Sequence, residues 1–358
     1  MRTLRLASDA VRVLAVPVLA VGLATGIAAL PATADMAPAP ADSSGFSGVL
    51  SAVAAVSTRD AWAVGSSTSF KALTVHWNGR AWKQVPNPAG MAGLSGVAAV
   101  SARDAWAVGG TTKNKTLLLH WNGRAWKEVL SPASAAFAAL SGVAVVSARD
   151  AWAVGSAGGG NQTLILHWNG KAWKQVPGTP GGAVLSGMAA VSAGDAWAVG
   201  STTKDKTLIL HWNGETWKRV PGTPDGAVLS GVAAVSARNA WAVGSTSKNK
   251  TLILHWNGKS WKQVSSPTPA GGAGLSGVAV TSARNAWAVG GTASKNKTLI
   301  LHWNGRAWKR VSSPSPGGST GALLSGVAAV SARTAWAVGT AGFASIAVIL
   351  RWNGTAWK

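Results

Sequence analysis

The string Trp-Asn-Gly occurs seven times in the chain, and in most copies a cation follows the glycine. An indole face suits the C–H face of a sugar ring, and the neighbouring amide and cation can hydrogen-bond its hydroxyl groups. The string is therefore a candidate sugar-binding motif, and the alternative is a solvated cation beside a half-buried Trp. The candidate binding residues are Trp77, Asn78, Arg80, Trp121, Asn122, Arg124, Trp168, Asn169, Lys171, Trp212, Asn213, Trp256, Asn257, Lys259, Trp303, Asn304 and Arg306.

An Asn-Gly pair between two strand-like segments indicates a two-residue type I′ hairpin, whose central residues both need positive φ. In the fourth copy this predicts that Trp212 pairs with Glu215 and that Leu210 pairs with Trp217. The basic residue found in other copies, such as Arg80, would then face the Trp of the turn. A cation over an exposed indole face adds about 0.5–1 kcal/mol of stability.

Two further series of polar residues occupy fixed positions in the copies. Metal ligands must converge on one ion, so a single His per copy predicts hydrogen bonding and no metal site. An Asp, Asn or Thr precedes each Ala-Trp-Ala-Val-Gly string, and we expect these side chains to cap a turn by accepting from a backbone N–H. The two series are His76, His120, His167, His211, His255 and His302, with Arg351 in the seventh copy, and Asp60, Asp104, Asp150, Asp195, Asn239, Asn285 and Thr334.

The 358 residues include neither Cys nor Tyr. The composition therefore excludes disulfides, thiolate nucleophiles and thiolate metal sites, and every mechanism that needs a phenol. The segments that depart from the repeat, at 158–162 and 341–346, add no acid or base. We expect no catalytic residues and no cofactor, so the protein is predicted not to be an enzyme.

The elements that must position these residues repeat every 44 to 49 residues, and all 21 Trp are repeat positions. In the fourth copy the segments 185–192, 196–200, 207–212 and 215–220 each predict a strand, because they are short and rich in apolar and branched residues. Four short antiparallel strands repeated seven times are typical of a propeller. The predicted fold class is all-β, a seven-bladed β-propeller of four-stranded antiparallel blades.

Alternation along the predicted second strand places Trp197 and Val199 on one side and Ala196 and Ala198 on the other. The bulky side of one blade can then pack on the small side of the next. At roughly 25 cal/mol per Å2 of buried apolar area, each such indole contributes a few kcal/mol. We expect no strand to be exchanged at ring closure and a short fourth strand in the last blade, which ends at Lys358.

Two composite motifs carry a resemblance to known families. They are Val-x-x-Val-x-x-x-Asp-x-Trp-Ala-Val-Gly and Leu-x-His-Trp-Asn-Gly-x-x-Trp-x-x-Val. Over residues 47–358 they resemble the blades of tectonin-type (tachylectin-like) propeller lectins, and they are similar to kelch and Asp-box propellers. Asn213 and its equivalents stand where the Asp-box has its Asp, and the turn is one residue shorter. The resemblance implies a propeller and leaves the function open, because propellers serve as lectins, enzymes and scaffolds.

The N-terminus has the pattern of a secretory signal peptide: three Arg, an apolar run at 13–30 and the small-x-small sequence 32–34. We expect a signal peptide at 1–34, a flexible Ala/Pro/Ser-rich leader at 35–45 and the propeller at 46–358. After cleavage no stable membrane span remains, and the protein is secreted. The alternative is that the N-terminal segment is retained as an anchor.

Lys and Arg number 33 against 11 Asp and Glu, a formal net charge of +22. The cations follow the repeat and are spread over both faces and the rim, so the expected partner is not a nucleic acid. Near-identical blades predict equivalent sites around a ring, hence multivalent binding. The predicted function is a secreted, monomeric, non-catalytic binding propeller that recognises glycans or cell-surface polymers. The alternatives are a protein-interaction scaffold and a polyanion binder.

Overall fold

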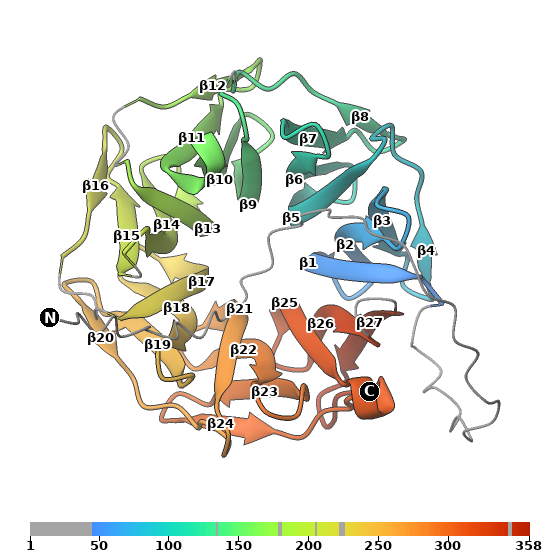
Figure 1. Cartoon of the computed structure of the whole chain (residues 1–358), viewed down its shortest axis with the longest axis vertical. Helices are drawn as coiled ribbons and strands as arrows, with labels where there is room; N and C mark the ends of the chain where they lie inside the picture. The colour runs from blue at the N-terminus through green and yellow to red at the C-terminus, as the bar shows by residue number, and fades with distance from the viewer. Residues whose placement is uncertain (1–44, 134, 178–180, 205, 222–225, 343–345) are drawn as a thin grey trace, which may run out of the picture. The chain divides into compact units, whose positions relative to one another are not determined.

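The computed structural model describes residues 45–133, 135–177, 181–204, 206–221, 226–342 and 346–358. The expected signal peptide and all but the last residue of the expected leader lie outside the described residues. The described chain forms seven antiparallel sheets arranged around one axis (Figure 1). The predicted seven-bladed β-propeller is confirmed. None of the helices in the part of the chain described here is long and apolar enough to cross a membrane.

Each blade runs outward from its first strand, which is the innermost (Figure 1). The first strands are β1 (Gly48–Ser57), β5 (Ala92–Ser101), β9 (Ala139–Ser147), β13 (Ala183–Ser192), β17 (Ala227–Ser236), β21 (Ala273–Ser282) and β25 (Ala322–Ser331). The second strands are β2 (Asp60–Ser67), β6 (Asp104–Thr111), β10 (Asp150–Ala157), β14 (Asp195–Thr202), β18 (Asn239–Thr246), β22 (Asn285–Thr292) and β26 (Thr334–Ala341).

The outer half of each blade is shorter. The third strands are β3 (Ala72–Trp77), β7 (Thr116–Trp121), β11 (Gln162–Trp168), β15 (Thr207–Trp212), β19 (Thr251–Trp256), β23 (Thr298–Trp303) and β27 (Ile346–Trp352). The fourth strands are β4 (Trp82–Gln84), β8 (Trp126–Glu128), β12 (Trp173–Gln175), β16 (Trp217–Arg219), β20 (Trp261–Gln263) and β24 (Trp308–Val311). Two 3-10 turns, η1 (Gly158–Gly160) and η2 (Gly318–Thr320), lie in the connections.

The seventh blade has three full strands, and its fourth is reduced to a single bridge between Trp352 and Trp357. Two backbone hydrogen bonds between Arg351 and Lys358, of 2.8 and 3.0 Å, hold this last segment in place. The prediction of a short final strand is confirmed.

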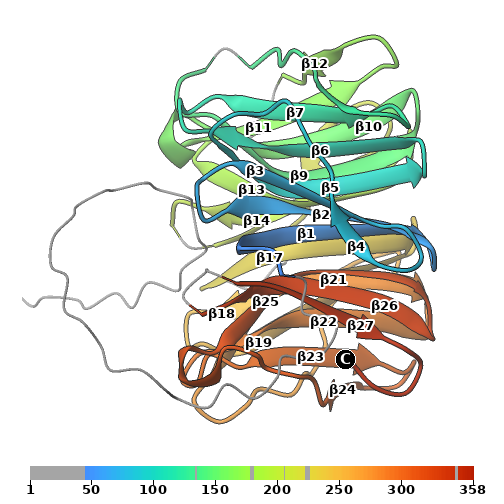
Figure 2. The ribbon, with the colours of Figure 1, turned by 90° about the vertical axis from the view of Figure 1, so that its right-hand side faces the viewer.

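The strands of each sheet follow chain order, so a blade has two kinds of end. The turns between first and second strands and between third and fourth strands share one end, which we call the turn face. The loops between second and third strands share the other end with the connections between blades, and we call this the loop face. Figure 2 shows the ring from its side. The turn face keeps one spacing in every copy, as between Trp77 and Trp82, whereas the loop-face segments vary in length.

Hydrophobic clusters between neighbouring blades hold the ring together. The cluster between the fourth and fifth blades contains Trp197 and Val199 of one blade and Ala240 and Ala242 of the next. Ala198, on the opposite side of the same strand, lies in the cluster with the preceding blade. The predicted pairing of a bulky side with a small side is therefore confirmed. The second-strand indoles are at most 1 % exposed, and they are Trp62, Trp106, Trp152, Trp197, Trp241, Trp287 and Trp336.

The ring closes by the same packing. Trp336 and Val338 of the seventh blade share a cluster with Leu50 and Leu73 of the first. Every sheet consists of consecutive strands, so no strand is exchanged, as predicted.

The backbone N–H of Ala347 donates to the carbonyl of residue 46 at 3.0 Å, beside a bridge between Ser47 and Ile346. Similar bridges join other neighbouring blades, as between Lys71 and Met91.

The glycine that ends each Ala-Trp-Ala-Val-Gly string is required by a close backbone approach. A Cβ atom placed on Gly65 would lie 1.9 Å from the carbonyl oxygen of Val49 and 2.9 Å from the Cα of Leu50. The first strand has a register shift between Leu50 and Ala52, which brings its backbone over the glycine. The equivalent glycine of every blade has the same contact, at 1.9 to 2.0 Å.

We expect Gly65→Ala to lower the free energy of unfolding by about 1–3 kcal/mol, because the added methyl must displace backbone atoms in a packed interior. The measurement is the denaturation midpoint. Gly90→Ala, in the connection to the second blade, is the matched control, because a Cβ there meets nothing within 4 Å. Equal midpoints for the two variants would contradict this account of the repeated glycine.

Candidate functional site

The turn between third and fourth strands has four residues, so the predicted two-residue type I′ hairpin is wrong. In the first blade Trp77 pairs with Trp82, and His76 pairs with Lys83. In the fourth blade Trp212 pairs with Trp217 instead of Glu215. The paired indoles lie 5.8 to 6.0 Å apart between ring centroids in the six blades with a full fourth strand.

The side chain of the turn Asn explains the longer turn. Its Oδ1 accepts from the backbone N–H groups two and three residues on, at 3.0 Å each in the first blade, from Arg80 and Ala81. Only the glycine has positive φ, +91° at Gly79, whereas a type I′ turn would require it at Asn78 as well. A side chain that mimics a backbone turn thus accommodates two extra residues.

The four-residue turn moves the cation away from the indole. Arg80 lies within the exposed turn, and Trp82 takes the place across the strand from Trp77 where the cation was expected. The predicted contact between the turn cation and the turn Trp is therefore wrong. Among the described residues, the only cation that lies over an indole ring is Arg351, in the last blade.

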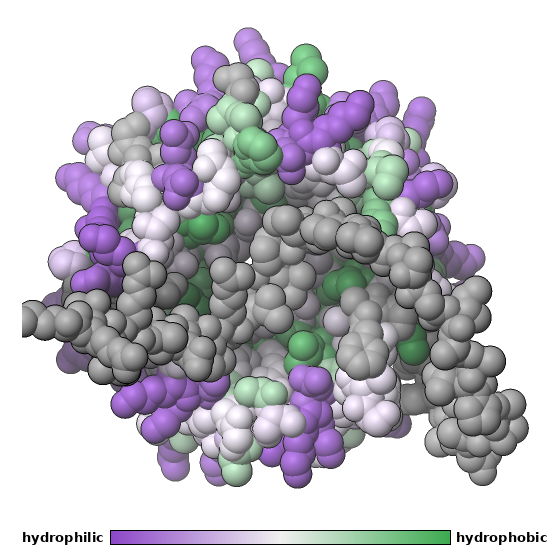
Figure 3. All heavy atoms as spheres, in the orientation of Figure 1, coloured by the Kyte–Doolittle hydropathy of each residue, from purple (hydrophilic) through white to green (hydrophobic). Residues whose placement is uncertain are grey.

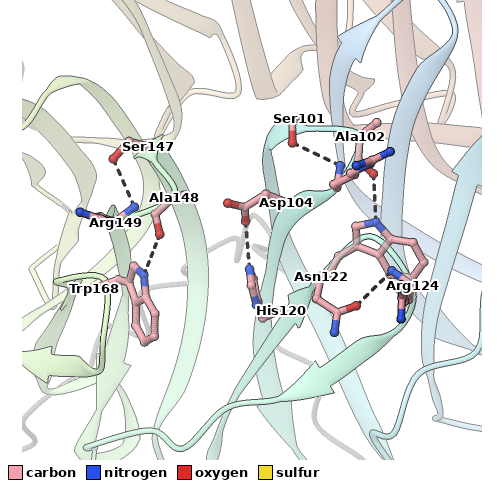
Figure 4. Close-up of polar contacts among 12 residues, drawn as sticks. Ser101, Ala102, Asp104, His120, Asn122, Arg124, Ser147, Ala148, Arg149 and Trp168 are labelled. Atoms are coloured by element: carbon pink, nitrogen blue, oxygen red, sulfur yellow. Dashed lines mark hydrogen bonds and ion pairs between the residues drawn. The ribbon is translucent and has the colours of Figure 1, made fainter.

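The candidate Trp residues anchor the turn. Trp121 donates its indole N–H to the carbonyl oxygen of Ala102 at 3.1 Å, and Trp168 does the same to Ala148 at 3.2 Å (Figure 4). The Trp121 ring also lies 4.8 Å from that of Trp62 in the preceding blade. Trp77 is 7 % exposed. The indoles at Trp121, Trp168, Trp212, Trp256 and Trp303 are half-buried, so little of each ring face is open to a sugar.

The other candidate residues are accessible. All six candidate Asn side chains and all five candidate cations are exposed. Each Asn uses its Oδ1 within its own turn, as at Asn122 with Arg124 (Figure 4), which leaves its amide group as a donor. The turns therefore expose amide and cationic donors to solvent, and the half-buried indoles below them hydrogen-bond to the adjacent turn.

In the first six blades the His lies beside the Asp or Asn of the same blade. His120 Nε2 lies 2.9 Å from Asp104 Oδ1 (Figure 4). The imidazole also stacks on Trp106 at 4.4 Å between centroids. The predicted hydrogen-bonding role of His is confirmed in the second to sixth blades, whereas His76 Nε2 in the first blade lies 3.4 Å from Asp60 and has no hydrogen-bond partner within the described part of the chain.

The predicted backbone cap by Asp is wrong, because Ser101 Oγ accepts from the backbone N–H of Arg103 instead. No group of three His, Asp or Glu that could hold a metal ion occurs among the described residues.

In the fifth and sixth blades an Asn replaces the Asp. His255 Nε2 lies 3.2 Å from Asn239 Oδ1, and His302 Nε2 lies 2.7 Å from Asn285 Oδ1. Burial lowers the pKa of both imidazoles from the ordinary value of 6.5, because it disfavours the charged form.

The seam between the last and first blades has a cation where the other blades have His. The Arg351 guanidinium carbon lies 5.3 Å from the ring centroid of Trp77 and 5.8 Å from that of Trp336, so it links the two blades. The sequence marks Arg351 as an exception to the His series, but the repeat pattern alone does not place it at the seam.

No protein-family model matches the chain, and no curated protein matches its sequence. Many solved structures are similar in fold, including the following three. The BP39L lectin from Burkholderia pseudomallei is 14 % identical with a TM-score of 0.61, over 86 % of this chain and 97 % of the lectin. YCF48 bound to D1 peptide is 14 % identical with a TM-score of 0.59, over 86 % of this chain and 94 % of YCF48.

The third is the GH74 xyloglucanase from Xanthomonas campestris, 15 % identical with a TM-score of 0.64. The match covers 87 % of this chain, which spans about half, 52 %, of the xyloglucanase. Identities at this level show the propeller fold alone. The resemblance to tectonin and kelch blades stays a prediction.

The lowered pKa of His255 and His302 makes stability depend on pH. As the pH drops from neutral through 6.5, the imidazoles of the unfolded state bind protons more readily than those of the folded state, whose pKa is lower. The free energy of unfolding therefore decreases as the pH drops. We expect the urea midpoint to decrease between pH 7.5 and pH 5.5. Asn239→Asp with Asn285→Asp should reduce this decrease, because a carboxylate stabilises the imidazolium.

The control for the added carboxylates is Thr334→Asp, at the equivalent position of the blade that has Arg351 in place of His. It should leave the decrease unchanged. An acid-induced decrease of equal size in the double variant would show that these two imidazoles do not cause it.

Proposed function

We propose that the protein is an exported, non-catalytic binding propeller that recognises glycans or repeating cell-surface polymers through several equivalent turns. The observation that carries the proposal is the exposure of the same Asn and cationic donors on the turn face of blade after blade. These donors are positioned by indoles that donate a hydrogen bond to the neighbouring turn, as Trp121 does to the carbonyl of Ala102. The turns thus form a repeated array of hydrogen-bond donors.

Repetition matters because one shallow turn binds weakly. A polymer that engages several turns makes its later contacts intramolecularly, so avidity can exceed single-site affinity by about 10²–10⁴ when the spacing allows simultaneous contact. The similarity to the BP39L lectin supports this reading, because a lectin of the same fold binds glycans. The similarity to YCF48 bound to D1 peptide favours the second candidate, a scaffold for a protein partner.

The carboxylates support a function without catalysis. Glycoside hydrolysis uses two carboxyl groups that flank one bond, about 5–9.5 Å apart. Among the described residues, the exposed carboxylates are Glu128 in the second blade and Glu215 in the fourth, so they belong to different blades. The Asp side chains of the His pairs are 12 to 19 % exposed, and each lies 2.9 to 3.4 Å from an imidazole nitrogen.

We also propose that residues 1–34 direct export and are then removed, which leaves Asp35 as the first residue. The basic start, apolar run and Ala-Thr-Ala sequence motivate this proposal. Mass spectrometry of the protein from the culture medium should find the N-terminus at Asp35. A full-length chain that stays with the membrane fraction would support the anchor instead.

Binding is tested with residues 35–358 and glycans immobilised at two densities. We expect retention to rise by about tenfold or more at the higher density, because only then can one propeller engage several epitopes. The measurement is the dissociation rate by surface plasmon resonance, with free monovalent glycan as the competitor. A dissociation rate independent of density would contradict multivalency, and no retention on any glycan would favour the protein-scaffold candidate.

A further inference from the structure

We infer that the turn face is the docking surface for an acidic polysaccharide, whose anionic groups are held by arginine side chains. The inference rests on the proposed function, because it names the ligand class and the face that binds it. It starts from an uneven distribution of the two basic residue types between the faces of the ring.

Arginine gathers on the turn face. That face carries Arg59, Arg80, Arg103, Arg124, Arg149, Arg238, Arg284, Arg306 and Arg333, with Lys171 and Lys259. The loop-face segments between strands carry no arginine, and their cations are Lys71, Lys113, Lys115, Lys204, Lys206, Lys248, Lys250, Lys295 and Lys297. Two further arginines, Arg219 and Arg310, lie within fourth strands. Net charge alone cannot account for this difference, because the two faces hold similar numbers of cations. Figure 3 shows hydrophilic side chains around the outer edge of the ring.

The two residue types differ in what they bind. The guanidinium is a planar fork of donors that matches a carboxylate or a phosphate with two parallel hydrogen bonds, whereas the ammonium of Lys is a hydrated point charge. Lysine suits a surface that stays solvated. A face with nine arginines suits the recognition of anionic groups with bidentate geometry.

The fold does not require these cations. In the fourth blade Gly194 stands at the position of Arg59, and its backbone N–H still bonds to Ser192 Oγ at 3.3 Å. Glu215 stands at the position of Arg80, and its N–H still bonds to Asn213 Oδ1 at 3.1 Å. The turns therefore form without a basic residue, and the cations of the other blades remain unexplained by local structure.

The two cations of a blade belong to adjacent turns. A Cβ placed on Gly79 would lie 3.1 Å from the Cβ of Arg59 and 3.2 Å from its Cγ, so the Arg59 stem lies across the glycine next to Arg80. The same contact repeats in the second blade between Gly123 and Arg103. The stem is therefore partly ordered before binding, which reduces the entropy that an ion pair must overcome.

The positive charge of this face is not neutralised by carboxylates. Every ion pair found between described side chains joins a His to an Asp. The exposed carboxylate on the turn face, within the described residues, is Glu215. Neighbouring cations without partners raise the local potential and attract a polyanion.

The ring of cations is open at the fourth blade. There Gly194 and Glu215 replace both basic residues, and Asp195 directly follows Gly194. A linear anionic chain would therefore follow the arc of the other blades and avoid the fourth. In the seventh blade Thr355 replaces one cation but Arg333 keeps the other.

The first test removes four charges from either face of residues 35–358. The turn-face set is Arg59→Gln, Arg103→Gln, Arg238→Gln and Arg284→Gln, and the matched loop-face set is Lys113→Gln, Lys115→Gln, Lys248→Gln and Lys250→Gln. Binding to immobilised polygalacturonate is measured in 150 mM salt, with dextran as the neutral polymer. We expect the turn-face set to lose affinity by about 100-fold or more and the loop-face set by less than about threefold.

The second test separates arginine from charge. Replacement of the same four arginines by lysine keeps the net charge, and we expect about tenfold weaker binding because the bidentate contact is lost. Unchanged affinity in this variant, or equal losses from the two neutralised faces, would overturn the inference in favour of nonspecific charge. Thermal melting of each variant shows whether the fold is kept.

The third test closes the gap in the ring. Gly194→Arg with Glu215→Gln raises the net charge of the turn face by two, through one added cation and one removed carboxylate, and Asn161→Lys with Gln162→Lys raises that of the loop face by two. A Cβ on Gly194 meets nothing closer than 3.9 Å, so the larger side chain fits. We expect the first pair to tighten binding by about threefold or more and the second to change it less. Equal gains would overturn the inference.

Other outcomes separate this inference from the proposed function. Retention on neutral glycans that the arginine variants leave unchanged would keep the binding propeller and overturn the acidic ligand. Tighter binding to double-stranded DNA than to polygalacturonate, with the same arginine dependence, would assign the face to nucleic acid. A protein that binds no polymer at all would overturn both.

Discussion

The whole ring depends on one interaction, in which the second-strand Trp of each blade packs against the next blade. The Trp197 ring lies 5.0 Å from that of Trp256 and 5.2 Å from that of Trp261, the latter at nearly a right angle. Edge-to-face contacts between indoles add about 0.5–1.5 kcal/mol beyond the area they bury. A single blade would leave its bulky side in water, so only a closed ring buries all seven indoles. A chain without Cys gains its stability from this packing.

The same packing fixes the turn face. The third-strand indoles that touch the preceding blade also donate to the carbonyl of the first turn, as Trp256 does to Ala237 at 2.9 Å. Each turn is therefore hydrogen-bonded to an indole that packs in the core between two blades. Length varies only in the loop-face segments, which this interaction does not reach. The turn face can thus present a regular array, and the loop face cannot.

The repeat predicted the strands well because each strand has a strong apolar pattern of its own. The third strand, predicted at 207–212, has the same bounds in the structure as β15. The turn after it was mispredicted because the Asn-Gly signal is local, whereas the pairing of Trp212 with Trp217 depends on burying both indoles on one face. The role of Arg351 could not be predicted from its own repeat, since its partner Trp77 lies 274 positions earlier in the chain.

Net charge is weak guidance to function in a repeat protein, because duplication multiplies whatever one unit contains. The type of cation at each position says more. Where the fold constrains a residue, as at the glycine of each Ala-Trp-Ala-Val-Gly string, its repetition reflects packing alone. At the positions of Arg59 and Arg80 the fourth blade shows that other residues keep the turn intact. Arginine repeated at positions the fold leaves free, and absent from the loop-face segments, therefore points to a ligand.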